Sequence, residues 1–261
     1  MKSISNSVSP TLLSIAAVAM GILSAASAKA DLVFDNMSNF ENSVAGAAVT
    51  GTSSTPNTFM GDGYVLSPGT TSITGFDLYP ANFTANTYTG LRVTFYIWGT
   101  VNTGAVSAGS PAFGNLLGTY TFDTLTPGFG PSSFYAIDNT PGSVPGYSLG
   151  APLAISSTTI GLTFNYQGTT DGVNYSSANG LTSLISYGTS PTVGSQVFNG
   201  YYRNANSEVN GNFTSTLRSL GLQNQSLGVR VYGVNPVPEP TALALVGAGG
   251  LALLAIRRRR A

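Results

Sequence analysis

The chain has 261 residues, with ten basic and ten acidic side chains and neither cysteine nor histidine. The lack of cysteine excludes disulfides and thiol nucleophiles. Without either residue, the usual zinc, copper and iron sites and every catalytic dyad or triad that uses imidazole are also excluded. The charge is unevenly distributed, because residues 31 to 235 hold four arginines against nine acidic side chains, a net charge of −5. An acidic domain without a basic cluster argues against nucleic-acid binding.

Residues 1 to 30 have the pattern of a secretory signal peptide. Lys2 precedes an apolar segment from Leu12 to Leu23, and small residues follow. Ala28 and Ala30 each end a small-x-small pattern of the kind at which signal peptides are cleaved. We predict cleavage after Ala30, with cleavage after Ala28 as the near alternative. A retained N-terminal membrane helix is the other alternative.

Residues 31 to 235 are predicted to form a secreted all-β domain, because aromatic residues alternate with β-branched ones. The expected strands are Leu32–Phe34, Tyr64–Leu66, Ser72–Tyr79 with a bulge near Gly75, Leu91–Thr100, Leu116–Asp123, Thr158–Tyr166 and Val229–Val234. The clearest is Leu91–Thr100, which places Leu91, Val93, Phe95 and Ile97 on one face and Arg92, Thr94, Tyr96 and Trp98 on the other. In Leu116–Asp123, the same alternation places four residues on one face of the strand: Leu116, Gly118, Tyr120 and Phe122.

The intervening segments are rich in glycine, proline and serine. We expect loops over residues 42–63, with a weak strand at Thr58–Met60, and over residues 101–115 and 124–152. Residues 181–186 and 213–222 are ambiguous, and the second segment also fits a short helix. Many short strands, Gly/Pro turns and little helix predict a single antiparallel β-sandwich of jelly-roll type.

Residues 236 to 261 form a tail of three parts. Pro238, Glu239 and Pro240 should be extended, because proline fixes φ and pushes the residue before it out of the helical region. Thr241–Ile256 is apolar or small throughout. As a helix it would span about 24 Å, a short transmembrane helix for a bilayer core of about 30 Å. A buried core helix is the alternative.

The third part of the tail is a cluster of four arginines, Arg257, Arg258, Arg259 and Arg260. Positive residues stay on the cytoplasmic side, so this cluster is a cytoplasmic stop-transfer signal and residues before Thr241 should lie outside. In this order, the three parts of the tail resemble the PEP-CTERM sorting signal. The same tail is also labelled an ice-binding protein C-terminal domain, although it is a sorting device.

The resemblance implies export across the inner membrane of a Gram-negative bacterium. It implies as partner exosortase, a membrane cysteine protease-transpeptidase that recognises the tail and removes the anchor. Many bacteria that use this signal make extracellular polysaccharide. The resemblance covers residues 236 to 261 and says nothing of what residues 31 to 235 bind.

Arg92, Tyr96 and Trp98 form the candidate ligand surface of the β domain. Successive same-face residues of a strand lie about 6.8 Å apart, so the three side chains should project together. Aromatic rings stack on sugar rings and an arginine bonds hydroxyl groups, so one interpretation is a glycan-contacting patch. The other, which we favour, is that the second sheet or the 101–115 loop covers this face, because Tyr and Trp are usually largely buried.

The acidic residues offer weaker candidates. A glycosidase needs two carboxylates about 5 to 9.5 Å apart; the available acids are Asp62, Asp77, Asp123, Asp138, Asp171 and Glu208, but none lies in a recognisable motif. Calcium needs several oxygen ligands, which the loops at Asp62-Gly63 and Asp171–Asn174 offer. Asp-Gly is first a turn signal. We therefore assign no catalytic residue, no metal site and no cofactor, and keep calcium as an alternative.

The sequence thus predicts an exported, C-terminally anchored surface or extracellular-matrix protein without catalytic activity, associated with polysaccharide or biofilm. A carbohydrate-binding module is the alternative, followed by a carboxylate-dependent hydrolase.

Overall fold

The computed structural model describes residues 31–38, 59–107, 109–134, 145–177, 180–186, 190–204 and 225–235. All of them belong to one unit of the chain, Ala30–Asn235. They form fifteen β-strands in antiparallel sheets, and this part of the chain contains no helix. The prediction of an all-β, antiparallel fold is thereby confirmed. The predicted signal peptide, the 213–222 segment and the tail lie outside the described residues.

The first main sheet has four strands in the order β1-β15-β3-β8. They are β1 (Asp31–Asp35), β15 (Val229–Val234), β3 (Ser72–Leu78) and β8 (Tyr147–Ala154). The register between β3 and β8 shifts between Ile73 and Gly75. A side chain at Gly75 would collide with the Tyr147 carbonyl and Pro145, so glycine permits this close approach. The bulge predicted near Gly75 is confirmed.

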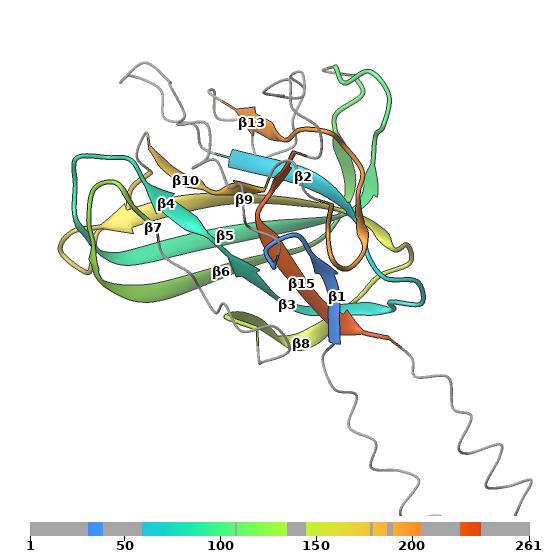
Figure 1. The fold of residues 1–261 in the computed structure, drawn as a ribbon, viewed down its shortest axis with the longest axis horizontal. Helices are drawn as coiled ribbons and strands as arrows, with labels where there is room; N and C mark the ends of the chain where they lie inside the picture. Colours follow the sequence, from blue (N-terminus) through green and yellow to red (C-terminus); the bar gives the residue numbers. More distant parts are fainter. Residues whose placement is uncertain are drawn as a thin grey trace, which may run out of the picture. The chain divides into compact units, whose positions relative to one another are not determined.

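The second main sheet has six strands, in the order β12-β2-β9-β5-β6 with β13 also paired to β2. They are β12 (Ser195–Gln196), β2 (Phe59–Val65), β9 (Thr159–Thr169), β5 (Tyr88–Val101), β6 (Phe113–Phe129) and β13 (Tyr202–Asn204). Figure 1 shows β3 running diagonally across the long strands β5 and β6, with β15 and β1 beside it.

Two small sheets join the remaining strands. One has the order β10-β4-β7 and the other pairs β11 with β14. Their bounds are β4 (Pro80–Asn82), β7 (Ser133–Phe134), β10 (Leu181–Ser183), β11 (Ile185–Ser186) and β14 (Ser226–Leu227).

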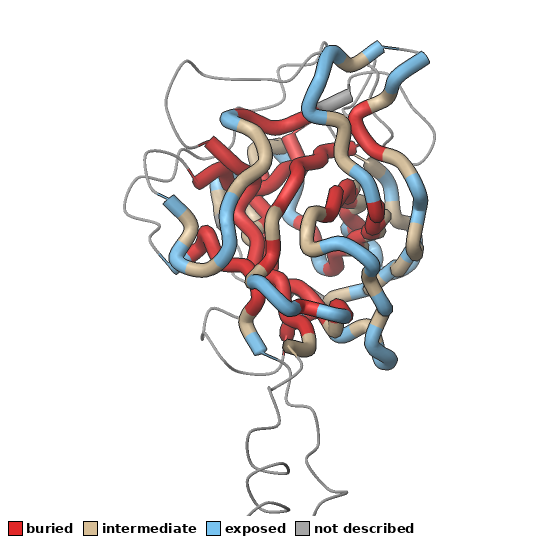
Figure 2. Tube along the Cα trace, turned by 90° about the vertical axis from the view of Figure 1, so that its right-hand side faces the viewer, coloured by how far each residue is buried: buried red, intermediate tan, exposed pale blue. Residues whose placement is uncertain are grey.

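The inner faces of the two main sheets meet in a shared hydrophobic core. Phe76 stacks on Phe95 with ring centroids 4.8 Å apart, and the rings of Phe34 and Tyr64 lie 4.6 Å apart. The apolar side of β5 faces this core, as predicted, with Leu91, Val93, Phe95 and Ile97 all at 0% exposure. Figure 2 shows the buried segments gathered inside the domain. Burying each such side chain stabilises the folded state by about 1.5–3 kcal/mol relative to leaving it exposed.

Two loop predictions are wrong. Within residues 124–152, β6 continues to Phe129, β7 follows, and β8 occupies Tyr147–Ala154. β8 ends the order of its sheet and has mostly exposed side chains, so its sequence lacks the alternation that marks a strand. Residues 59–65 form a strand inside the second sheet instead of a loop with a weak strand at 58–60.

Candidate functional site

The outer face of the six-stranded sheet carries the three residues predicted to contact glycan. Arg92, Tyr96 and Trp98 lie on β5, alternating with residues that face the core. Their environments differ. The Arg92 side chain is 35% exposed, Tyr96 is half-buried, and Trp98 is only 5% exposed. The structure therefore places the three on one face but leaves Arg92 and Tyr96 as the more accessible two.

Arg92 forms a bidentate ion pair across the sheet. Its Nε donates to Asp123 Oδ1 at 2.6 Å and its second terminal nitrogen to Asp123 Oδ2 at 2.8 Å. The pair's hydrogen bonds raise the pKa of Arg92 and lower the pKa of Asp123. The guanidinium carbon also lies 4.2 Å from the centroid of the Tyr175 ring. The Arg92 guanidinium is thus paired with a carboxylate and lies within cation–π distance of an aromatic ring.

Further polar side chains surround this ion pair. Thr94 on β5 and Thr121 on β6 share a hydrogen bond of 3.0 Å between their hydroxyl oxygens. Across from β5, β9 places Asn165 opposite Thr94 and Gln167 opposite Arg92. The Oδ1 atom of Asn165 is buried and has no hydrogen-bond partner among the described residues. This part of the face thus combines hydroxyl, amide and guanidinium groups, the chemistry that binds hydroxyl-rich ligands.

Trp98 belongs instead to a small hydrophobic cluster on the same face. Its indole Nε1 donates to Thr163 Oγ1 at 3.0 Å. Its ring stacks on Phe113 at 6.4 Å, and Phe113 contacts Tyr202 at 5.7 Å. The remaining buried members of the cluster are Phe59 and Ala112. Phe113 and Ala112 come from the segment predicted as the 101–115 loop, so that segment covers Trp98.

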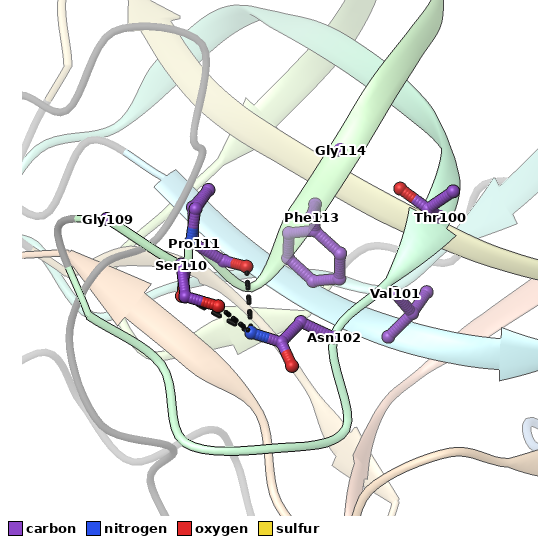
Figure 3. Close-up of a pocket in the computed structure, with 8 residues that line it drawn as sticks. All are labelled: Thr100, Val101, Asn102, Gly109, Ser110, Pro111, Phe113 and Gly114. Atoms are coloured by element: carbon purple, nitrogen blue, oxygen red, sulfur yellow. Dashed lines mark hydrogen bonds between the residues drawn. The ribbon is translucent and has the colours of Figure 1, made fainter.

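A shallow pocket of about 360 Å³ lies beside this cluster (Figure 3). Asn102 organises its wall, because its side-chain Nδ2 donates to Ser110 Oγ at 2.9 Å and its Oδ1 accepts from the Gly104 N–H at 2.9 Å. Phe113 lines the pocket, and its other lining residues are Thr100, Val101, Gly109, Pro111 and Gly114. These residues offer hydroxyl, amide and apolar contacts but no charged group.

Asp62 on β2 is a buried carboxyl group. It is 0% exposed and accepts hydrogen bonds from Ser226 Oγ at 2.7 Å, the Leu227 N–H at 3.0 Å and the Gly63 N–H at 2.7 Å. Burial raises its pKa to about 8, although these hydrogen bonds act in the opposite direction. Asp62 therefore joins β2 to β14 and is closed off from solvent.

A second buried polar group lies on the four-stranded sheet, where Arg230 is placed between two aspartates. Its Nε lies 3.3 Å from Asp35 Oδ1 and its Nη1 lies 3.8 Å from Asp77 Oδ2. Tyr232 donates to Asp77 Oδ2 at 2.6 Å. Burial acts to raise the pKa of Asp35, but hydrogen bonds from Ser38, Thr192 and the Met37 N–H, together with Arg230, lower it. The side chains of Arg230, Asp35 and Asp77 are each no more than 3% exposed, which marks a structural network.

The acidic residues considered for hydrolysis or calcium binding are dispersed. Asp62 and Asp77 are buried, Asp123 pairs with Arg92, and Asp138 and Glu208 lie outside the described residues. Asp171 accepts hydrogen bonds from the backbone of Asn174 and Val173, which hold its pKa well below the usual range. It thereby closes a turn at Gly172, whose φ is +78°. Among the described residues, no three acidic side chains gather where a metal ion would bind.

Two partners of this face were missed by sequence reasoning. Asp123 was identified as an acid but not as the partner of Arg92. Its outward alternation in the predicted 116–123 strand, combined with antiparallel pairing to 91–100, was the available signal. Tyr175 lies beyond β9 in the Asp171 turn region, and the sequence contains no signal that would bring it over Arg92.

The sorting residues predicted in the tail, Pro238–Pro240 and Arg257–Arg260, lie outside the described residues, as do Ala28 and Ala30. In the part of the chain that the structure does describe, no helix has the length and apolar character needed to cross a membrane.

Comparison with known families identifies the tail. Residues 236–260 match the family model of the PEP-CTERM protein-sorting motif. No curated protein and no solved structure matches the chain. The chain therefore combines an all-β domain with a PEP-CTERM sorting motif, which indicates an exported protein that is processed by exosortase.

Proposed function

We propose that this protein is a surface or extracellular-matrix protein without catalytic activity, associated with the polysaccharide or biofilm of a Gram-negative bacterium. The observation that carries the proposal is the PEP-CTERM motif at residues 236–260, joined directly to the β domain. In this account residues 1–30 are a cleaved signal peptide and Thr241–Ile256 is a transmembrane helix. The helix holds the protein in the inner membrane until exosortase acts at the Pro238–Pro240 motif.

We also infer that residues 31–235 form a jelly-roll-like sandwich. The orders β1-β15-β3-β8 and β2-β9-β5-β6 support this, because β1, β2 and β3 alternate between the two main sheets and β15 inserts between β1 and β3. Such double-sheet architectures are common supports for binding surfaces on their faces and loops. The fold by itself does not define a function.

The absence of catalytic activity is supported by chemistry. The chain has no histidine and no cysteine. Each described acid considered for hydrolysis is already engaged: Asp62 and Asp77 by buried hydrogen bonds, Asp123 by Arg92, and Asp171 by its turn. None of these four presents a free carboxylate beside a second one.

Cell fractionation tests the proposed sorting. Wild-type protein and a variant with Pro238, Glu239 and Pro240 all replaced by alanine would be expressed in the native host. We expect the wild type at the surface or in the medium and the variant in the inner-membrane fraction. Identical distributions would contradict sorting through this motif.

A second candidate is carbohydrate binding by the outer face of the six-stranded sheet. The observation that favours it is the exposed Arg92–Asp123 pair stacked on Tyr175, with Tyr96 further along β5. Because Asp123 neutralises Arg92, this surface suits a neutral, hydroxyl-rich glycan. Trp98 would support the sheet from its cluster instead of touching the sugar.

Glycan-array binding tests this second candidate. We expect Arg92→Ala and Tyr96→Ala to lose binding, while Trp98→Phe, which keeps the cluster filled, retains it. Unchanged binding in the first two variants would contradict the assignment, and loss in Trp98→Phe alone would move the site to the cluster.

A further inference from the structure

The end of the domain from which the tail leaves is built from four segments that lie together. The β2–β3 turn, Ser67–Thr71, joins the β8–β9 turn, Ile155–Thr158, because the Leu66 N–H donates to the Thr158 carbonyl at 2.8 Å and the Ile155 N–H to the Thr71 carbonyl at 2.9 Å. β1 begins there and β15 ends there, since Asp31 pairs with Gly233 (Figure 1). We call these two turns, with Asp31 and Asn235, the exit end.

The last residue before the tail is fixed to the exit end. Thr70 Oγ1 lies 2.8 Å from Asn235 Oδ1 and 2.7 Å from the Ser67 carbonyl oxygen, so its single hydroxyl hydrogen is shared between these two acceptors. The Thr71 N–H donates to the Val234 carbonyl at 3.0 Å. The tail could be lengthened only by detaching β15 from the sheet. That would break its pairing with β1 and β3 and expose Val231 of the core. The tail therefore starts from a rigid point.

The spacer between this rigid point and the sorting motif is very short. Asn235 is followed by Pro236 and Val237, and the motif begins at Pro238. Three residue steps reach at most about 11 Å, and the six steps to Thr241 at most about 22 Å. A protease that holds the motif in its active site must bring its own surface to within that distance of the exit end.

The composition of the exit end suits such an approach. Its two turns contain no charged residue, and Pro68, Thr71, Ser156 and Ser157 are exposed. Asp31 is the acidic residue at this end. The exposed acids Asp123 and Asp171 lie toward the other end, since β9 runs 11 residues from Thr159 to Thr169 before the Asp171 turn, a distance of roughly 35 Å.

We propose that the exit end is the surface of the domain that docks against the tail-processing membrane protease. The proposal rests on the proposed function, because it assumes that the tail is processed. The contact is enforced by the short spacer, so it needs no high affinity. If the exit end docks in this way, the shape of the β8–β9 turn should affect the rate of tail processing, even though the turn is far from the motif in sequence.

The test combines a bulky substitution with a longer spacer. Ser156→Trp places a large side chain at the exit end, and Val173→Trp is the matched control, because Val173 is 75% exposed in the Asp171 turn at the other end. Each is made with the native spacer and with about ten Gly/Ser residues inserted between Asn235 and Pro236, a flexible segment of roughly 17 Å. The fraction of protein that has lost its tail is followed by pulse-chase and intact mass.

We expect Ser156→Trp to slow processing about tenfold with the native spacer. Displacing a reacting segment by about 1 Å can reduce a reaction rate by about 100-fold, so a tenfold decrease is expected from a bulky side chain that shifts the docked domain. The inserted spacer should restore the wild-type rate, and Val173→Trp should have no effect with either spacer. Wild-type processing in Ser156→Trp, or equal slowing with both spacers, would overturn the proposal. A wild-type protein that keeps its tail would instead overturn the proposed function.

Discussion

Arg230 and Arg92 both pair with aspartates, but they do so on different sheets and in opposite surroundings. The Arg230 side chain is 3% exposed and is held between two carboxylates, whereas the Arg92 side chain is 35% exposed and is paired with one. Charges removed from water must be paired, so losing one member of the first network should destabilise the fold. An exposed ion pair adds little stability and stays accessible, which is what a ligand-binding surface needs.

The largest expected effect comes from removing the buried arginine. Arg230→Met leaves Asp35 and Asp77 in a buried position without their cation, which should lower the free energy of unfolding by about 3–5 kcal/mol. Urea denaturation followed by the fluorescence of Trp98, the single tryptophan, would measure the change. A loss below about 1 kcal/mol would mean that the network is not structurally required.

Asp62 is also buried, but its partners are N–H and O–H groups instead of a guanidinium. Its folded pKa of about 8 lies above its ordinary value of 3.8. The folded state therefore binds one more proton between these two pH values. Its stabilising contribution is complete below about pH 4 and is lost as the pH rises through about 8.

The free energy of unfolding of the wild type should therefore fall between pH 5 and pH 8 at about 1.4 kcal/mol per pH unit from this group. Asp62→Asn cannot titrate, so its unfolding free energy should lack this slope, whatever its absolute stability. Denaturation curves at several pH values would decide, and parallel pH dependences in the two proteins would show that Asp62 is ionised in the fold.

A smaller effect is expected from Tyr232, which donates to Asp77 at 2.6 Å beside Arg230. Tyr232→Phe keeps the ring but removes this donor from a buried carboxylate, which should cost about 1.5–3 kcal/mol. The measurement is the same urea titration. If Tyr232→Phe proved as damaging as Arg230→Met, the hydrogen bond and not the cation would be the main support of Asp77.

The smallest effect is expected from Arg92→Met, the matched control for Arg230→Met. The exposed pair with Asp123 is screened by solvent, so the unfolding free energy should change little and any change should shrink at high salt. Glycan binding, by contrast, should be lost if this face is the ligand surface. A large, salt-independent loss of stability would remove the distinction between the two networks.

Sequence reasoning succeeded where alternation and burial coincide. β5, β9 and β15 were predicted, and the apolar side of β5 faces the core. It failed at β2, where Asp62 and the glycines beside it conceal the pattern; a side chain at Gly63 would meet Phe198 at 2.9 Å. It also failed at Leu116, which is 42% exposed because the register shifts at the Ile97/Trp98 bulge and reverses the alternation of β6.

The candidate sites show the same difference between local signals, which the sequence reveals, and long-range pairings, which it does not. Arg92 and Tyr96 were identified from one strand, because local alternation is visible in the sequence. The pairing of Arg230 with Asp35 joins residues 195 positions apart, and that of Tyr232 with Asp77 joins residues 155 apart. Such pairings depend on how the sheets assemble and leave no local signal. The tail, by contrast, was recognised because its signal is contiguous.

The most direct test of the account is the intact mass of the wild-type protein isolated from its native host. We expect a species that begins at Asp31, has lost its C-terminal residues from the region of Pro238–Pro240 onward, and is recovered outside the inner membrane. A protein that retains the chain through Ala261 and stays in the inner membrane would contradict processing by exosortase and leave a plain anchored β domain.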